Sequence, residues 1–229
     1  MPIQWFHSFD FGDGERASGM KSLEQLRDEA ERIFIEGVKG KTVLDIGAWD
    51  GYFSFEAERR GAARVLATDY FCWSGPGWGT KAGFDHAHKK LQSKVESRDV
   101  DVFGLDPREL GIFDVVLFLG VLYHLKNPLG GLEQVFKMTN EMAVIETQTD
   151  ELENPAPVMR FYLGRALAND PTNFGRPICL VSKTCCARSA SSGSSIRRRR
   201  TPTSPEAAAG LSSMRGNSPS HEISLDSKF

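Results

Sequence analysis

Apolar positions between residues 5 and 177 follow two alternating periods. Continuous apolar runs, which are typical of buried strands, fall at residues 42–47, 64–69, 111–121 and 141–148. Apolar positions three and four apart, which are typical of amphipathic helices, fall at residues 22–37, 52–61, 81–95 and 127–139. Strands that alternate with helices predict an α/β fold, in which a parallel sheet is covered by helices on both faces.

The pattern changes after Pro177. The last 51 residues hold 13 serines and an IRRRR run, with almost no apolar periodicity. This composition predicts a disordered, low-complexity tail over residues 178–229. A basic arm that contacts nucleic acid is the alternative interpretation.

Composition and charge narrow the class of protein. A chain of 229 residues is long enough for one domain with a full core. Acidic residues outnumber basic ones by 27 to 20 in residues 1–178, which argues against nucleic acid held by phosphate contacts alone. We expect no membrane span, because no apolar run is long enough, and no secretory signal, because the N-terminus lacks a basic region followed by an apolar run. We also expect no metal site, because the four cysteines lack metal-ligand or disulfide spacing. These features predict a cytoplasmic protein.

The turn after the first predicted strand, DIGAWDG at residues 45–51, is poor in glycine. A dinucleotide loop needs three glycines so that the backbone can approach a pyrophosphate, but Trp49 stands where such an approach requires glycine. S-adenosylmethionine has no phosphate and relaxes this demand. Asp69, at the end of the second predicted strand, is suited to accept both ribose hydroxyls. The alternative is structural: Asp45 caps the turn and Asp69 ends a strand.

Four stretches of the chain resemble class I S-adenosylmethionine-dependent methyltransferases, and are most similar to the tRNA wobble-uridine (5-oxyacetate pathway) methyltransferases and carboxymethyltransferases. They are VLDIGAWDGYFSFEAERRGAARVLATD, FDVVLFLGVLYHLKNPLGGLEQV, WFHSFDFGDG and RFYLGRALANDPTNF. The resemblance covers residues 5–174 and implies a Rossmann-like fold. We expect a helical lid segment at residues 1–40, a cofactor-binding domain at residues 41–177 and the tail beyond.

The resemblance also implies where S-adenosylmethionine binds. Asp45, Gly47 and Gly51 would line its methionine end, and Asp69 would bind the ribose. Further cofactor-binding positions are Asp101 and Val102 beside adenine, and Leu119 and Gly120 beneath the cofactor. The alternative for Asp101 is a solvated loop acid.

Two residues of the GVLYH motif are the candidate catalytic residues. Tyr123 and His124 follow the fourth predicted strand and should face the transferred group. His124 has a pKa suited to a general base, and Tyr123 is placed to orient the cofactor or the acceptor. The alternative for His124 is a structural core histidine. His7 is expected either to close over the pocket or to lie on the surface.

Carboxymethyl-transferring relatives hold an extra carboxylate with cations and the tyrosine of GVLYH. Tyr123 matches that tyrosine, but no convincing lysine stands in the N-terminal segment and the C-terminal arginine region has no counterpart. This departure favours the ordinary cofactor. We therefore expect methyl transfer to a small molecule or a tRNA wobble uridine. The alternatives are carboxymethyl transfer to tRNA, or an inactive remnant that binds cofactor or RNA.

The segment after Phe174 departs from the resemblance. Back-translation with one base restored there yields FWPPNLPGLEDMLREVGFK, which has the helical periodicity that the fold expects next. We interpret the C-terminus as frameshifted by a one-base deletion near codon 174. On this hypothesis the sheet lacks its last strands, and the fifth strand becomes an exposed edge.

Overall fold

The computed structural model describes residues 2–77, 79–149, 158–177, 195–197 and 220–226. Its helices and 3₁₀ turns are α1 (Leu23–Ile33), α2 (Tyr52–Arg59), α3 (Ala82–Lys90), η1 (Val102–Gly104), α4 (Pro107–Leu110), η2 (Leu122–His124) and α5 (Pro128–Met138). Its strands are β1 (Phe9–Asp10), β2 (Arg16–Ala17), β3 (Thr42–Ile46), β4 (Arg64–Asp69), β5 (Glu96–Asp99), β6 (Phe113–Leu119), β7 (Thr139–Gln148), β8 (Met159–Phe161), β9 (Gly175–Pro177), β10 (Ser195–Arg197) and β11 (Ser220–Asp226).

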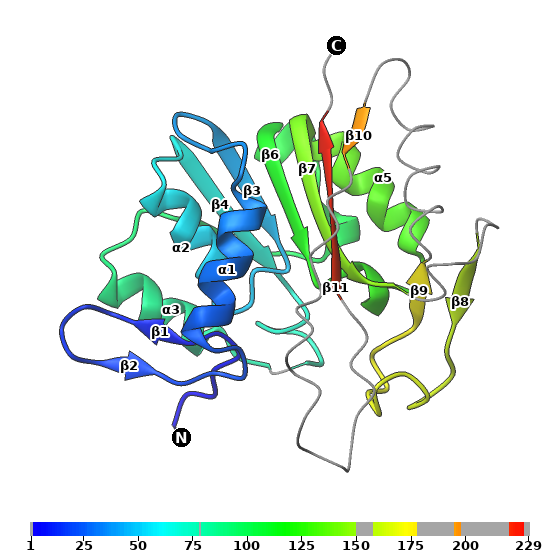
Figure 1. Cartoon of the computed structure of the whole chain (residues 1–229), viewed down its shortest axis with the longest axis horizontal. Helices are drawn as coiled ribbons and strands as arrows, with labels where there is room; N and C mark the ends of the chain where they lie inside the picture. The colour runs from blue at the N-terminus through cyan, green and yellow to red at the C-terminus, as the bar shows by residue number, and fades with distance from the viewer. Residues whose placement is uncertain (1, 78, 150–157, 178–194, 198–219, 227–229) are drawn as a thin grey trace, which may run out of the picture.

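The main sheet confirms the predicted α/β, Rossmann-like fold. Its strand order is β10-β11-β7-β6-β3-β4-β5, and the strands from β7 to β5 are parallel. The order reverses direction at β3, since β4 and β5 follow on one side and β6 and β7 on the other (Figure 1). Ligands of open α/β sheets bind at such a switch point, outside the carboxyl ends of the strands.

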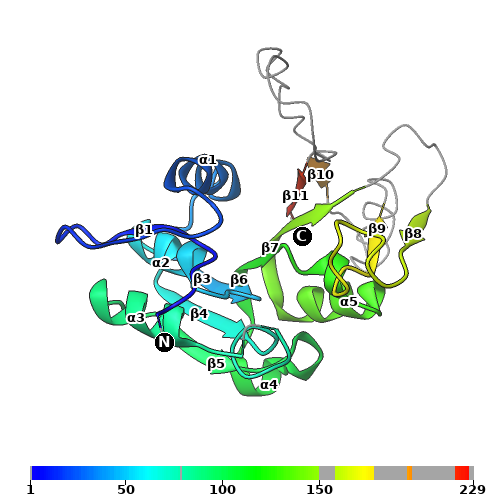
Figure 2. The ribbon, with the colours of Figure 1, turned by 90° about the horizontal axis from the view of Figure 1, so that it is seen from below.

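Helices cover both faces of the sheet because successive strand residues point to opposite sides. Val43, Val65 and Val115 belong to a core cluster that also contains buried residues of α1, α2 and α3. Their neighbours in sequence belong to a second cluster, which contains buried residues of α5. Figure 2 shows the two layers on either side of the strands.

The helix boundaries follow local capping chemistry. Ser22 forms a capping box with Gln25 at the start of α1, as the predicted serine cap requires. Asn127 caps α5, and Pro128 occupies its first turn, where no backbone N–H is needed. Gly61, with φ +87°, follows the end of α2, which confirms the predicted glycine stop.

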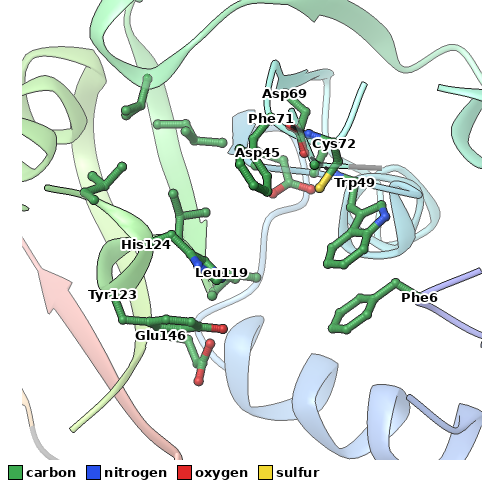
Figure 3. Close-up of a pocket in the computed structure, with 18 of the residues that line it drawn as sticks. Phe6, Asp45, Trp49, Asp69, Phe71, Cys72, Leu119, Tyr123, His124 and Glu146 are labelled. Carbon is green, nitrogen blue, oxygen red and sulfur yellow. Dashed lines mark hydrogen bonds between the residues drawn. The ribbon is translucent and has the colours of Figure 1, made fainter. Parts of the chain in front are cut away.

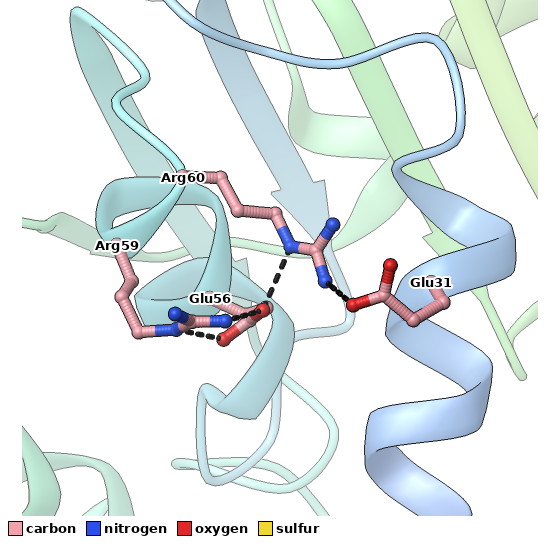
Figure 4. Close-up of polar contacts among 4 residues, drawn as sticks. All are labelled: Glu31, Glu56, Arg59 and Arg60. Carbon is pink, nitrogen blue, oxygen red and sulfur yellow. Dashed lines mark hydrogen bonds and ion pairs between the residues drawn. The ribbon is translucent and has the colours of Figure 1, made fainter.

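An ion cluster joins α1 to α2 (Figure 4). Glu56 accepts from Arg59 and Arg60 at 2.6 and 2.7 Å, and Arg60 also contacts Glu31 of α1 at 2.5 Å. Burial raises the pKa of Glu56, but the hydrogen bonds from the two arginines outweigh it and hold the pKa below its usual range. The N-terminal helix is thus tied to the sheet by charge as well as by the shared core.

The predicted absence of the last strands is corrected. β11 pairs antiparallel with β7 from Ser220↔Gln148 to Asp226↔Met142, and β10 pairs with β11. β7 is therefore not an exposed edge, because its outer backbone groups have ladder partners. Ile223 and Leu225 alternate with polar residues, a period-2 signal that the surrounding serines obscured. Residues 178–194, 198–219 and 227–229 lie outside the described residues, so the predicted disorder is not tested there.

Candidate active site

A cavity lies at the carboxyl ends of β3, β4, β6 and β7. One side, here called the turn wall, consists of residues 45–49 and Asp69. The opposite side, here called the η2 wall, consists of Tyr123, His124 and Glu146. Figure 3 shows the two walls facing each other, with Phe6 beside Trp49. The predicted residues that line this cavity are Asp45, Gly47, Asp69, Asp101, Val102, Leu119, Gly120, Tyr123 and His124.

The turn wall requires glycine at position 47. Gly47 has φ +79°, and a Cβ there would collide with Cγ2 of Val121. Its N–H and that of Ala48 donate to the carbonyl of Thr68 at 2.8 and 3.0 Å. The turn is thereby fixed against β4. Gly51 does not line the cavity; its φ of +84° and its contact with Phe84 and Phe55 give it a packing role at the start of α2.

Asp69 organises the turn as well as facing the cavity. Its Oδ2 accepts from the N–H of Trp49 at 3.0 Å, and its Oδ1 accepts from the N–H of Cys72 at 2.9 Å. Burial raises the pKa of Asp69, although these two hydrogen bonds act in the opposite direction. Each oxygen has a further lone pair, so two ribose hydroxyls can still donate to this carboxylate. The structural alternative and the binding role are therefore compatible.

Asp45 is a buried carboxylate at the floor of the cavity. It is 3% exposed and accepts from Oγ of Ser54 at 2.6 Å. Burial, with a smaller contribution from the neighbouring charge of Asp69, raises its pKa to about 7. A buried carboxylate of this kind is stabilised by a cation. The ammonium group of an amino-acid ligand is such a cation.

Asp101 and Val102 lie at the start of η1. The Asp101 carboxylate accepts from the N–H of Phe103 at 2.9 Å and is exposed, whereas Val102 is buried. Asp101 thus caps η1 in the manner of a loop acid while also lining the cavity. Leu119 ends β6, and Gly120 follows with φ +71° and donates to the carbonyl of Glu146 at 3.0 Å.

The η2 wall holds half-buried polar groups. The Tyr123 hydroxyl and Oε2 of Glu146 both lie 3.7 Å from the point where a Cβ on Gly120 would stand. Burial raises the pKa of Tyr123, and the carboxylates of Glu146 and Asp170 raise it further. Tyr123 is therefore a neutral hydroxyl at physiological pH.

His124 is held by a segment that is distant in sequence. Its Nδ1 lies 2.9 Å from the carbonyl oxygen of Thr172, and its ring stacks on Phe71 with centroids 6.4 Å apart. Burial lowers the pKa of His124, so the imidazole is neutral near pH 7.

The N-terminal segment contributes to the cavity more than the sequence indicated. Phe6 stacks on Trp49 with centroids 4.1 Å apart and ring planes 5° apart. Asp50 accepts from the backbone N–H groups of Phe6 and His7 at 2.7 and 3.0 Å. His7 is 6% exposed and lines the cavity, so the interpretation as a surface residue is wrong and the closing one is supported.

Sequence reasoning missed several lining residues. Lys21 lines the cavity, with Nζ bound by both carboxylate oxygens of Glu29 at 3.0 and 2.8 Å. Glu146 stands near the end of the apolar run of β7, and a charge inside such a run was the available signal. The segment 170–174 also lines the cavity, but its position depends on long-range contacts that no local pattern encodes.

Among the residues that the structure describes, no three or more His, Cys, Asp or Glu side chains gather as a metal site would require. Within the same residues, no helix has the length and apolarity to cross a membrane.

Curated proteins match part of this chain. A tRNA U34 carboxymethyltransferase of Dichelobacter nodosus is 37% identical over 99 residues, which are 43% of this chain and 29% of that protein. Its counterpart in Helicobacter pylori strain Shi470 is 30% identical over 112 residues, 47% of this chain and 41% of that protein. The matched region thus spans less than half the length of these relatives.

Solved structures share the fold at low identity. The N-terminal domain of EvdMO1, solved with S-adenosylhomocysteine and D-fucose, superposes with a TM-score of 0.66 at 18% identity, over 96% of this chain and 89% of that one. The magnesium protoporphyrin IX methyltransferase of Synechocystis gives 0.57 at 13% identity, over 90% and 79%.

The model of the methyltransferase domain family matches residues 17–174, which hold β3 to β8, the turn wall and the η2 wall. That range is well over half of the chain, and it confirms the family predicted from the sequence. The chain therefore belongs to the methyltransferase domain family.

Proposed function

We propose that this chain is a cytoplasmic S-adenosylmethionine-dependent methyltransferase whose cofactor lies along the turn wall and whose acceptor lies against the η2 wall. The observation that carries the proposal is the gathering of a tight glycine turn, two buried carboxylates and a Tyr–His pair around one cavity. The chain spans less than half the length of these relatives. The proposed activity is therefore argued from the residues around the cavity and not from the relatives' names.

The residues present fit the cofactor. Asp45 would receive the methionine ammonium, which supplies the positive charge that this buried carboxylate lacks. Asp69 would bind the ribose hydroxyls, and Asp101 with Val102 would border the adenine. The bound cofactor supplies an electrophilic methyl group on a sulfonium. Leu119 and Gly120 would lie beneath it, and the segment 1–40 would cover it through Phe6 and His7.

The residues of the η2 wall would prepare the acceptor. Tyr123 is a neutral hydroxyl that can donate or accept a hydrogen bond, and it would orient the nucleophile. His124 is a neutral imidazole, so it can take a proton from a nucleophile that becomes acidic as it reacts. Both groups are half-buried at the cavity, so an acceptor bound there can reach them.

Two acceptors remain in the proposal. The names of the similar relatives favour a tRNA wobble uridine. The excess of acidic residues in residues 1–178 favours a small molecule. Assaying methyl transfer from labelled S-adenosylmethionine to unmodified tRNA transcripts at two salt concentrations would separate them. A tRNA enzyme should label the transcript and lose activity as the salt concentration rises.

Carboxymethyl transfer is a second candidate, because Lys21 lines the cavity and supplies a cation near Phe6. We rank it below methyl transfer, since Glu29 already neutralises the Lys21 ammonium. A competition experiment measures whether S-adenosylmethionine or its carboxylated analogue binds the site more tightly. Tighter binding of the analogue would reverse this ranking.

The primary test is calorimetric titration of the full chain with S-adenosylhomocysteine and, separately, with NAD. We expect saturable binding of S-adenosylhomocysteine and none of NAD. Preference for NAD, or binding of neither, would contradict the proposal. Salt-dependent RNA binding without methyl transfer, abolished by deleting residues 197–200, would instead support an inactive RNA-binding remnant.

A further inference from the structure

The contact between His124 and Thr172 defines the protonation of the imidazole ring. The carbonyl oxygen of Thr172, 2.9 Å from Nδ1, is only an acceptor. The Thr172 hydroxyl oxygen also lies 3.2 Å from Nδ1. That hydroxyl has one proton, and it donates it to Oδ1 of Asp170 at 2.7 Å. Both Thr172 oxygens therefore face Nδ1 as acceptors, so Nδ1 must carry the ring proton.

Asp170 fixes this arrangement from the outside. Its Oδ1 also accepts from the N–H of Thr172 at 2.8 Å, so one carboxylate oxygen sets both the turn and the direction of the hydroxyl. The turn is attached to η2 at a second point, because the N–H of Phe174 donates to the carbonyl of Tyr123 at 2.9 Å. The segment 170–174 is thus bound to η2 at two points, the His124 ring and the Tyr123 carbonyl.

We propose that Asp170 and Thr172 are positioning residues that hold His124 in its Nδ1-protonated form, so that Nε2 is the base for an acceptor bearing an O–H or N–H group. The inference rests on the proposed function, because it assumes that the transferred methyl group lies in this cavity. It goes further by naming the tautomer, the residues that set it and the chemical class of the acceptor.

The step balances in atoms and charge. The acceptor oxygen or nitrogen forms a bond to the methyl carbon while the carbon–sulfur bond breaks, and the bonding pair stays on sulfur. The acceptor's proton passes to Nε2, which yields an imidazolium. Asp170 lies close enough to raise the pKa of His124, so its charge stabilises that imidazolium. Acceptors that lose no proton on methylation, such as carboxylates, would gain nothing from this base.

Other charged groups around His124 fit the same scheme. Burial is the largest influence on its pKa and lowers it, whereas the Thr172 carbonyl and Asp170 raise it. Tyr123, adjacent in η2, is neutral at physiological pH because burial raises its own pKa. The charge of Asp170 is moderated by Arg165 as well as by His124. The net result is a neutral ring that can become charged during turnover.

The test uses the full chain with ¹⁵N-labelled histidine and saturating S-adenosylhomocysteine. Long-range proton–nitrogen correlation spectra distinguish the two neutral tautomers and the imidazolium directly. The His124 signals are those that disappear in His124→Gln. We expect the Nδ1-protonated tautomer at pH 7.5 and a midpoint below the ordinary histidine value. A dominant Nε2-protonated ring, or an imidazolium at pH 7.5, would overturn the proposal.

Matched variants separate positioning from simple packing. Thr172→Val removes the hydroxyl and keeps the shape, whereas Thr172→Ser keeps the hydroxyl. The backbone carbonyl of residue 172 still accepts from Nδ1 in Thr172→Val, so we expect this variant to gain only a minor Nε2-protonated fraction and Thr172→Ser to restore the wild-type spectrum. Asp170→Asn should lower the His124 midpoint further. Unchanged spectra in Thr172→Val and Asp170→Asn would refute the positioning role.

The same samples keep the two proposals distinguishable. If the wild-type chain fails to bind S-adenosylhomocysteine, the proposed function fails, whatever the tautomer. If S-adenosylhomocysteine binds Thr172→Val, Thr172→Ser and Asp170→Asn as tightly as wild type, and all three give the wild-type histidine spectrum, the proposed function stands and this inference fails. Melting temperatures recorded on each sample identify any variant that loses its fold.

Discussion

The turn wall and the η2 wall of the cavity are assembled over different distances along the chain. The turn wall is local: residues 45–49 and Asp69 come from one β3–α2–β4 unit, and the backbone hydrogen bonds of the turn join it to the neighbouring strand β4. The η2 wall is assembled over longer distances: Tyr123 and His124 lie in η2, Glu146 lies in β7, and His124 is held by Thr172, 48 positions away. Changes to the turn wall should therefore affect folding and binding together, whereas changes to the η2 wall should affect chemistry alone.

The largest expected effect is the pH dependence of stability that Asp45 produces. Burial raises its pKa from 3.8 to about 7, so the folded protein holds this proton more tightly than the unfolded chain. The resulting stabilisation is fully present below about pH 4 and is lost as the pH rises to about 7, a change on the order of 4 kcal/mol.

Asp45→Asn should flatten that slope and raise the unfolding free energy at pH 8 relative to wild type. Urea denaturation between pH 4.5 and 8 measures it. Some slope will remain, because burial also raises the pKa of Asp50 to about 6. Asp85→Asn, on the exposed side of α3, is the control and should leave the slope unchanged. Equal slopes in Asp45→Asn and wild type would count against a strained carboxylate in the turn wall.

A glycine pair tests the shape of the turn wall. Both Gly47→Ala and Gly37→Ala place an alanine in a left-handed backbone conformation. In Gly47→Ala the new Cβ also collides with Val121, whereas in Gly37→Ala it has nothing within 4 Å. We expect Gly37→Ala to cost about 1–2 kcal/mol and Gly47→Ala about 1–3 kcal/mol more. Thermal unfolding measures the difference, and titration with S-adenosylhomocysteine should show weaker binding only for Gly47→Ala. Equal losses in the two variants would mean that the contact with Val121 is unimportant.

Asp69→Asn should weaken S-adenosylhomocysteine binding by about tenfold or more, since a charged acceptor of two hydroxyl hydrogen bonds is lost. It should also lower the melting temperature, because the new amide group faces the N–H of Trp49 or of Cys72. Asp101→Asn is the matched comparison: an exposed amide oxygen can replace its carboxylate, so we expect about a threefold change at most. A similar loss in both variants would show that net charge, rather than a ribose contact, governs binding.

Tyr123→Phe should have the smallest effect on stability and binding, although it removes the hydroxyl of the η2 wall. We expect the unfolding free energy to change by less than about 1 kcal/mol and S-adenosylhomocysteine affinity by less than about twofold. Methyl transfer to an accepted substrate should nevertheless slow. A large loss of cofactor affinity in Tyr123→Phe would assign this side chain to the cofactor instead, and would break the distinction between the walls.

The frameshift hypothesis for the C-terminus stays a prediction. The pairing of β11 with β7 shows that the sheet can be extended by the tail as written, but it does not bear on the coding frame. Reading the coding DNA around codon 174 in all three frames decides the matter. A frame that continues with the amphipathic helix PNLPGLEDMLREVGF would support the deletion, and its absence would leave the basic tail as the native sequence.

Particular residues show what local sequence could predict. Ser22, Pro128 and Gly61 identified helix boundaries because capping and backbone conformation depend on neighbours only. Asp45, Gly47 and Asp69 were found because one β–α–β unit places them together. Lys21, Phe6 and Asp170 were missed, since each reaches the cavity through contacts with segments distant in sequence.

By itself the sequence determined the alternation of strands β3, β4, β6 and β7 with helices, the tight turn at Gly47 and the membership of the family, because hydrophobic period, glycine conformation and motif spacing are local properties of the chain. Only the tertiary structure decided which strand covers β7, which residues form the η2 wall and which nitrogen of His124 faces a carbonyl. Those outcomes depend on pairing and burial between distant segments, whose free energies no single stretch of sequence contains.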